Sequence, residues 1–257
     1  YLGSDLYLID PAIADLTQWQ AIGISLGSLA FGWIAYDQIC KSRFGDDNTR
    51  LMIGLYVILV CMAWGYTQVF TGRAALLHLG AFTATIMSAN VFMIIMPNQR
   101  IVVADLKAGR KPDPKYGKIA KQRSTHNNYL TLPVLFLMLS NHYPLVFATQ
   151  YNWIIASLVF LMGVTIRHWF NSKHARTGNP HWTWFLTAVI FLIIAWLSTA
   201  PMRHRPDEAA LNGPALTYAS AAGFDDVVSI IQGRCSMCHA AEPSWEGIHY
   251  APKNVVL

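Results

Sequence analysis

Six long apolar stretches constrain the fold of this chain more than any other feature of its sequence. Each is close to the ~20 residues that a helix needs to cross a bilayer, and almost all charged residues lie between them. The composition agrees, because 54% of the 257 residues are hydrophobic and only 13% are charged. The sequence therefore predicts an all-α fold, a polytopic transmembrane helix bundle with six spans: Trp19–Ile39, Leu51–Phe70, Ala74–Met96, His126–Val146, Tyr151–Phe170 and Trp182–Thr199.

The Lys and Arg residues predict the orientation of this bundle. They are concentrated in Lys41–Arg50, in Pro97–Thr125 and in the turn after Thr165, whereas the alternate loops carry almost none. Because basic loops stay in the cytoplasm, everything after Pro201 is expected on the outer side. The net charge of +5 is then explained by the basic loops that orient the bundle in the membrane. We therefore expect a lipid bilayer as partner, with basic loops against its anionic headgroups, and no nucleic acid.

The run Cys235-Ser236-Met237-Cys238-His239 is the attachment signature of a c-type haem. Cys235 and Cys238 would form covalent bonds with the haem vinyl groups, and His239 would be the metal ligand. Covalent haem attachment takes place in the bacterial periplasm, which is the side that the basic loops predict for this segment. A zinc site is the competing interpretation, because Cys-x-x-Cys binds metal and His249 is close in sequence. The adjacent Cys238 and His239 are awkward ligands for a tetrahedral site.

The sequence predicts three parts. Residues 1–202 form the transmembrane domain, residues 203–214 are a Pro-rich charged linker, and residues 215–257 begin an α-helical cytochrome c domain in the periplasm. Only 18 residues follow His239, too few for the other helices of such a domain. The sixth iron ligand is therefore either beyond this chain or His249. The chain does not start with Met, so we expect it to be a piece of a longer protein of the bacterial inner membrane.

Five runs carry a resemblance to a known family: Ala89–Phe92, Pro97–Arg100, Tyr116–Phe136, Ser140–Pro144 and Arg167-His168. They resemble the membrane domain of the bacterial membrane-bound urate oxidases. Those proteins join a multi-helix urate oxidase domain to a C-terminal cytochrome c, which is the order found here. The resemblance extends over essentially the whole chain, although further N-terminal helices and the end of the cytochrome are absent.

The resemblance implies a function in purine degradation. The chain would oxidise urate to 5-hydroxyisourate and pass the electrons to its own c-type haem, and from there to a downstream respiratory acceptor. It also implies that Cys235, Cys238 and His239 hold this haem. Two other classes of function stay open: a membrane-anchored cytochrome that takes electrons from quinol, and a transporter with a cytochrome appendage. A transporter would favour internal repeats, and the sequence shows none that we recognise.

Polar side chains at the cytoplasmic helix ends are the candidate urate site, because such groups are costly in hydrocarbon and usually face a cavity. Urate is a flat anion that suits an Arg fork and carboxamides. We predict that Arg100 or Arg167 binds the anion, that Asn127 or Asn128 orients the ring and that His126 is the base. Taken singly, an Arg that snorkels or an Asn that caps a helix is an equal alternative. Asn98, Gln99 and His168 complete this group, and Asp37 is interpreted as an interfacial charge.

Electrons from a cytoplasmic site would have to cross a hydrocarbon core of ~30 Å to reach the outer haem. Two histidine pairs, His78 with His142 and His126 with His168, would suit b-type haems held between helices. The alternatives are that the site opens to the periplasm, or that these histidines only form hydrogen bonds within the bundle. Pro133 is expected to interrupt the fourth span, an arrangement found where a helix lines a cavity.

Overall fold

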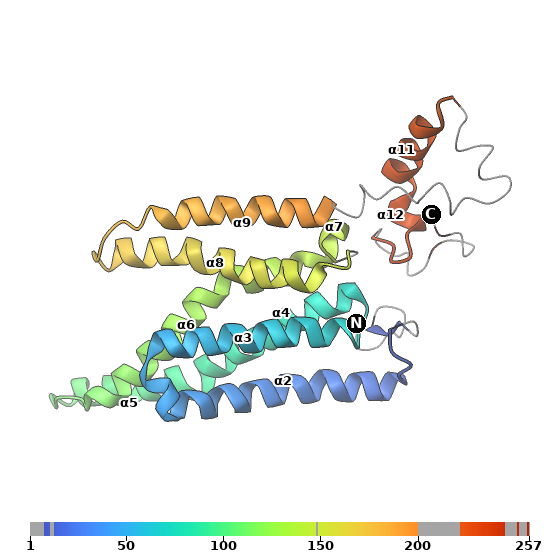
Figure 1. Cartoon of the computed structure of the whole chain (residues 1–257). Coiled ribbons are helices and arrows are strands. Elements are labelled where there is room, and N and C mark those ends of the chain that lie inside the picture. Colours follow the sequence, from blue (N-terminus) through green and yellow to red (C-terminus); the bar gives the residue numbers. More distant parts are fainter. Residues whose placement is uncertain are drawn as a thin grey trace.

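The computed structural model describes residues 8–10, 13–147, 149–199 and 222–244, together with 251 and 256. Every regular element in these ranges is helical, which confirms the predicted all-α fold for this part of the chain (Figure 1). The predicted linker 203–214 and His249 lie outside the described residues. The division of the chain into domains therefore stays a prediction.

The long helices lie side by side, with α4 and α6 at the centre of the bundle (Figure 1). α2 and α3 contact α4 on one side, and α8 joins α6 to α9 on the other. A π-helix, η2 (Asn90–Ile95), connects α4 to α5, and two short 3-10 turns are η1 (Arg43–Asp46) and η3 (Ser140–His142). The α-helices are α2 (Gln18–Lys41), α3 (Asn48–Thr67), α4 (Gly72–Ala89), α5 (Met96–Lys107), α6 (Pro114–Leu139), α7 (Pro144–Phe147), α8 (Asn152–His174), α9 (Trp182–Thr199), α11 (Phe224–Arg234) and α12 (Ser236–His239).

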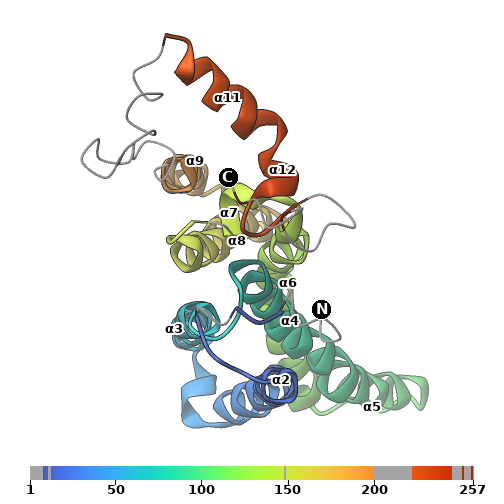
Figure 2. The same cartoon turned by 90° about the vertical axis from the view of Figure 1, so that its right-hand side faces the viewer.

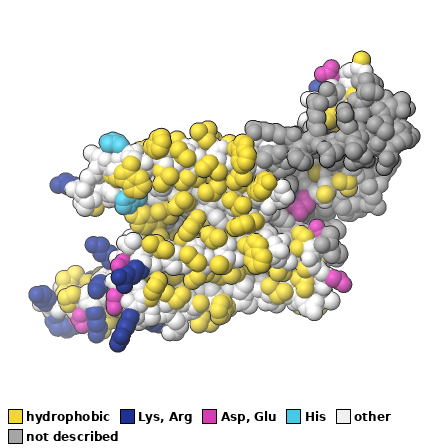
Figure 3. Space-filling model, viewed as in Figure 1, with side chains coloured by type: hydrophobic (Ala, Val, Ile, Leu, Met, Phe, Trp, Pro, Cys, Tyr) yellow, Lys and Arg dark blue, Asp and Glu magenta, His cyan; other side chains and the backbone are white. Residues whose placement is uncertain are grey.

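Four helical segments of the described chain, not six, are long and apolar enough to cross a membrane. The predictions of spans at Trp19–Ile39 and His126–Val146 are therefore wrong by this criterion. The four segments are consistent with a membrane location, as are the apolar side chains that cover the face of the bundle seen in Figure 3. The segments are Asn48–Thr67, Gly72–Lys107, Asn152–His174 and Trp182–Thr199.

α2 forms where the first span was predicted, but small and polar residues lower its mean hydropathy. Gly23, Ser25, Gly27, Ser28 and Gly32 follow one another along the helix. Of these residues, Gly32 allows close packing against α4, because a Cβ there would lie 2.1 Å from a ring carbon of Phe82. At Gly32, a residue that lowers the hydropathy of α2 thus also allows close contact with α4.

α6 differs from the predicted fourth span because it begins at Pro114, well before His126. Its first turns carry Lys and Arg residues, and the chain after Leu139 continues as η3 and α7 instead of extending the helix. The apolar run is therefore shorter than a bilayer. Pro133 does not interrupt α6, which runs through it as one helix.

The predicted basic loop Pro97–Thr125 is a helical hairpin formed by α5 and the start of α6. Gly109 allows the turn, with a left-handed φ of 69°. Asp113 caps α6 by accepting a hydrogen bond from the backbone N–H of Lys115, and this bond lowers the pKa of the Asp113 carboxyl. Lys and Arg side chains gather at this end of the molecule, which we call the basic end (Figure 3). The cytoplasmic location of the basic end stays a prediction.

The ring of Pro133 packs against Gly163 of α8. A Cβ on Gly163 would lie 2.6 Å from the Pro133 Cδ and Cγ atoms, and a proline ring cannot rotate away. We expect Gly163→Ala to destabilise the bundle by about 1–3 kcal/mol, because it overpacks a close helix contact. Gly65→Ala is the matched control, since a Cβ there meets nothing within 4 Å. Thermal unfolding in detergent should show a lower midpoint for the first variant alone, and equal midpoints would contradict the close contact.

Candidate functional site

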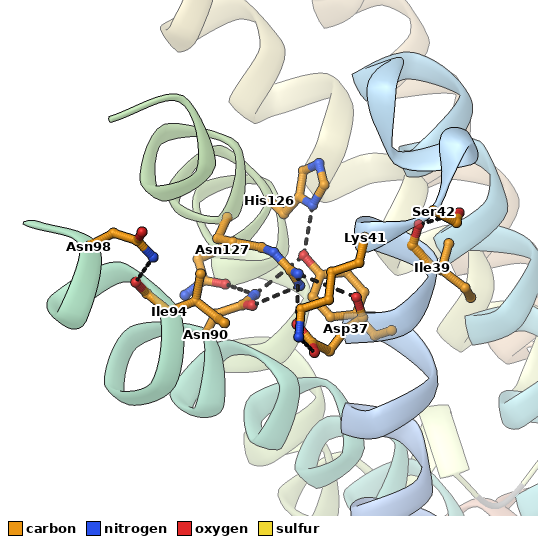
Figure 4. Close-up of polar contacts among 11 residues, drawn as sticks. Asp37, Ile39, Lys41, Ser42, Asn90, Ile94, Asn98, His126 and Asn127 are labelled. Atoms are coloured by element: carbon orange, nitrogen blue, oxygen red, sulfur yellow. Dashed lines mark hydrogen bonds and ion pairs between the residues drawn. The ribbon is translucent and has the colours of Figure 1, made fainter. Parts of the chain in front are cut away.

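A buried network of polar side chains joins α2, η2 and α6 near the basic end (Figure 4). Asn90 and His126 are 0% exposed, and Arg123 is 2% exposed. Such groups are costly inside an apolar bundle unless they are paired with one another. Its members are Tyr36, Asp37, Lys41, Asn90, Arg123, His126 and Asn127.

Helical spacing on α6 and the π-helix η2 bring this network together. Arg123, His126 and Leu130 follow one another at intervals of three and four residues, so they share the face of α6 that is buried. A π-helix adds one residue to a turn and is frequent at functional sites. Here it opens with Asn90, whose side chain bonds to both α2 and α6.

The charged half of the network is a buried ion pair. The Arg123 Nη2 atom lies 2.8 Å from the Asp37 Oδ1 atom, and Nη1 donates to the Asn90 Oδ1 atom at 3.3 Å. The guanidinium also lies over the Tyr36 ring, 4.9 Å from its centroid. Lys41, which is more exposed, is the second cation on Asp37. Asp37 is therefore a buried counter-ion, and its interpretation as an interfacial charge is wrong.

The neutral half is a chain of hydrogen bonds around His126. The Tyr36 hydroxyl and the His126 Nδ1 atom are 2.7 Å apart, and the Asn90 amide donates to the same hydroxyl at 3.3 Å. Asn90 also donates to the Asn127 Oδ1 atom at 2.9 Å, and Asn127 donates to the Met87 carbonyl. The His126 Nε2 atom is buried and has no hydrogen-bond partner in the described part. This chain fixes the rotation of α6 against α2 and α4.

A separate open groove of about 780 Å³ at the basic end is lined by residues of the α5–α6 hairpin and of the last turns of α8. The volume is in the range of small-molecule sites. Most of its side chains can form hydrogen bonds, and two tyrosines add ring surface. The polar and aromatic lining residues are Gln99, Tyr116, Lys121, Ser124, Thr125, Asn128, Tyr129, Asn171 and His174.

Asn128 gives this groove an acceptor that the protein itself does not use. Its Oδ1 atom is buried without a hydrogen-bond partner in the described part of the chain. Its backbone carbonyl accepts a hydrogen bond of 3.2 Å from the Arg167 Nε atom. Lys121, two turns earlier on α6, adds a positive charge to the same lining. The groove thus offers a cation, carboxamides and flat rings together.

The structure divides the predicted site residues between these places. His126 and Asn127 belong to the network, whereas Asn128 lines the groove and holds Arg167 beside it. Arg100 is exposed on α5 and lines a different surface hollow. Sequence reasoning missed Tyr36, Asn90 and Arg123. The signal for Arg123 was its three-residue spacing from His126 on a helix whose buried face continues to Leu137.

The predicted histidine pairs for b-type haem show hydrogen bonds within the bundle. The two ring nitrogens of His78 lie 2.6 Å from the Ser25 hydroxyl and 2.8 Å from the Ala74 carbonyl, so this ring would have to break a bond to reach iron. His168 Nδ1 lies 3.1 Å from the Tyr129 hydroxyl. His142 is exposed in η3. A b-type haem between these residues stays a prediction, and no step is assigned to it.

The predicted haem attachment residues lie within one helical turn. Cys235 precedes α12, Cys238 and His239 end it, and both thiols are free. Apolar side chains follow the preceding helix α11 at intervals of three residues and are exposed within the described part: Phe224, Val227 and Ile230. An unpaired thiol pair beside an uncovered apolar face fits a haem. The described residues contain no group of three side chains suited to a bare metal ion, and His249, the further ligand of the zinc alternative, lies outside them.

The described part of the chain is an all-helical bundle with apolar side chains on its outside and a polar groove at its basic end. A model of the urate oxidase N-terminal family matches residues 1–198 of the chain. The chain therefore belongs to this family, which supports an oxidoreductase that acts on urate. The matched range contains the network and the groove and ends before Cys235. Neither a curated protein nor a solved structure matches the chain.

Proposed function

We propose that this chain is a membrane-bound urate oxidase that delivers electrons from urate to a c-type haem on the same chain. Urate and one water give 5-hydroxyisourate, two protons and two electrons. The family match over residues 1–198 carries this proposal, because that range builds the groove. The free thiols of the Cys235–His239 turn support the part of the proposal that concerns a c-type haem on the same chain.

Urate binds in the groove at the basic end. The Lys121 ammonium offsets the charge of the anion, and the unused Asn128 Oδ1 atom accepts a hydrogen bond from a ring N–H. Tyr116 and Tyr129 offer rings beside which a flat purine can stack. His174 is the histidine of the lining, and its imidazole is suited to accept a proton from the bound substrate.

The network acts by positioning and does not line the groove. His126 and Asn127 hold the inner face of α6 against α2 and η2, while Asn128, the next residue, faces the substrate. A rotation of α6 would therefore move Asn128. The roles predicted from the sequence, His126 as the base and Asn127 as a residue that orients the ring, stay predictions. In this proposal both side chains act through the position of α6.

Cys235 and Cys238 would attach the haem, and His239 would bind its iron. When bound, a haem accepts one electron at a time. The two electrons of urate would therefore reach it in two successive transfers. The groove is lined by α5, α6 and the last turns of α8 at the basic end, and α12 lies at the opposite end of the bundle (Figure 1). A helix of 20 residues such as α3 is ~30 Å long. The reaction therefore requires electron transfer along the bundle.

The test is anaerobic addition of urate to oxidised membranes that carry the full-length protein. We expect the haem spectrum to become that of the reduced form. Lys121→Ala should raise the urate concentration for half-maximal rate about tenfold, because a hydrogen bond to a charged group contributes about 1.5 kcal/mol or more. Asn128→Ala should also weaken urate binding.

Lys118→Ala is the matched control, because Lys118 is exposed one turn before Lys121 and does not line the groove. It should leave the urate dependence unchanged. A haem that stays oxidised with urate but is reduced promptly by a quinol would contradict the proposed function and favour the electron-transfer protein. An equal effect of the two Lys variants would contradict the groove as the site.

A further inference from the structure

The segment that follows the haem attachment turn contacts the end of the bundle opposite the basic end. Figure 2 looks onto this end and shows α12 in front of the part of the bundle near α7. Arg73, in the first turn of α4, donates hydrogen bonds to the backbone carbonyls of Glu242 and Pro243. Pro243 is buried in this contact. Only two residues, Ala240 and Ala241, separate Glu242 from His239.

The Glu242 side chain binds the N-terminus of α4. Its carboxyl group accepts hydrogen bonds from the backbone N–H groups of Gly72 and Arg73. These N–H groups have no partner within the helix, and the helix dipole favours an anion at this point. The carboxylate therefore completes the α4 cap that Thr71 begins.

The bundle side of this contact is rigid. Arg73 is 8% exposed, and its guanidinium lies over the Phe147 ring, 4.9 Å from the centroid. Gly72 packs closely as well, since a Cβ there would lie 2.4 Å from the Phe147 carbonyl oxygen. Arg73 is thus held in place on α4 while it binds a different part of the chain.

Burial raises the pKa of the Glu242 carboxyl, although Arg73 and the backbone N–H groups act in the opposite direction. A neutral side chain of the same shape should therefore be tolerated at this position. This predicts that Glu242→Gln keeps the contact, while Glu242→Ala, which removes the acceptor, loses it.

We propose that Arg73 and Glu242 form a latch that docks the haem-bearing segment on the N-terminal end of α4. The latch fixes His239 beside the bundle, so that electrons leaving the membrane domain meet a haem at a constant short distance. This role rests on the proposed function. Arg73 and Glu242 are positioning residues, because neither is assigned a contact with substrate or haem.

The docking test uses the full-length protein with a protease site placed in the predicted linker 203–214. After cleavage in lipid nanodiscs, the cytochrome fragment should stay bound to the membrane domain during size-exclusion chromatography. Arg73→Ala and Glu242→Ala should each weaken this association at least about tenfold, because each removes charge-assisted hydrogen bonds. Glu242→Gln should retain it. Asp226→Ala and Arg234→Ala are matched controls, since both residues are exposed on α11.

A second measurement follows haem reduction in the uncleaved variants. Arg73→Ala and Glu242→Ala should slow reduction by urate, while direct reduction by dithionite stays at the wild-type rate. Retention of the fragment by both Ala variants, or its release from the cleaved wild type, would overturn the latch. Release of the fragment with an unchanged urate-driven rate would overturn its role in electron delivery. Failure of urate to reduce even the wild type would contradict the proposed function alone, because the docking result does not depend on urate.

Discussion

Asp37→Ala is expected to destabilise the bundle by about 3–5 kcal/mol, because it leaves the buried Arg123 charge without a counter-ion. Arg123 is 2% exposed and Asp37 is 8% exposed, so water does not replace the lost carboxylate. The remaining Asn90 contact is neutral and does not offset a full charge. Thermal unfolding in detergent should show a strongly lowered midpoint.

A double-mutant cycle separates this cost from a general loss of packing. Arg123→Met should have a smaller effect than Asp37→Ala, since Lys41 still neutralises Asp37. The double variant should be more stable than Asp37→Ala alone, because the uncompensated charge is gone. Asp105→Ala is the surface control: its pair with Arg110 is exposed, and such pairs contribute about 0–1 kcal/mol. A double variant as unstable as the sum of the two single changes would show that the pair is not coupled.

Much of the fold follows from residue patterns within single segments. The apolar runs that became α3, α8 and α9 were predicted within a few residues, because unbroken apolar length specifies such helices without help from neighbours. The third span was predicted to end at Met96, before a basic loop that begins at Pro97, a residue that lacks a backbone N–H. The structure continues through it as α5, because η2 changes the hydrogen-bond register just before the proline. A change of register of this kind is not visible in residue types.

The residue types of the candidate site could be predicted from the sequence, but the pairs that these side chains form across helices could not. Asn128 was predicted from the density of amides and cations around it, and it does line the groove. Arg100 was grouped with it as another polar residue at a cytoplasmic helix end, whereas α5 carries Arg100 onto an exposed face that lines a different hollow. Asp37 seemed isolated in the sequence, since its partner Arg123 lies 86 residues away on another helix. Pairings across helices depend on packing, which a single sequence does not give.

Removal of both Cys235 and Cys238 should abolish covalent haem, which is the largest functional effect that we expect. In a denaturing gel, haem should remain with the wild-type chain and be absent from a Cys235→Ala/Cys238→Ala variant. Thioether bonds survive unfolding, whereas an axial ligand alone does not hold a haem in a denatured chain. Anaerobic urate should then produce no haem signal in the variant, although urate binding at the distant groove stays near the wild-type value.

The chain provides a matched control, because its other two cysteines, Cys40 and Cys61, are also free thiols but lie in the bundle. A Cys40→Ala/Cys61→Ala variant removes the same number of sulfurs and should keep the haem through the gel. His239→Ala tests the remaining member of the motif. The two thiols can still attach the haem, but the imidazole ligand of the iron is lost, so the spectrum of any haem that stays bound should change. Haem that leaves the wild-type chain with acid acetone, or zinc bound in its place, would contradict the assignment, since only a covalently attached haem resists that extraction.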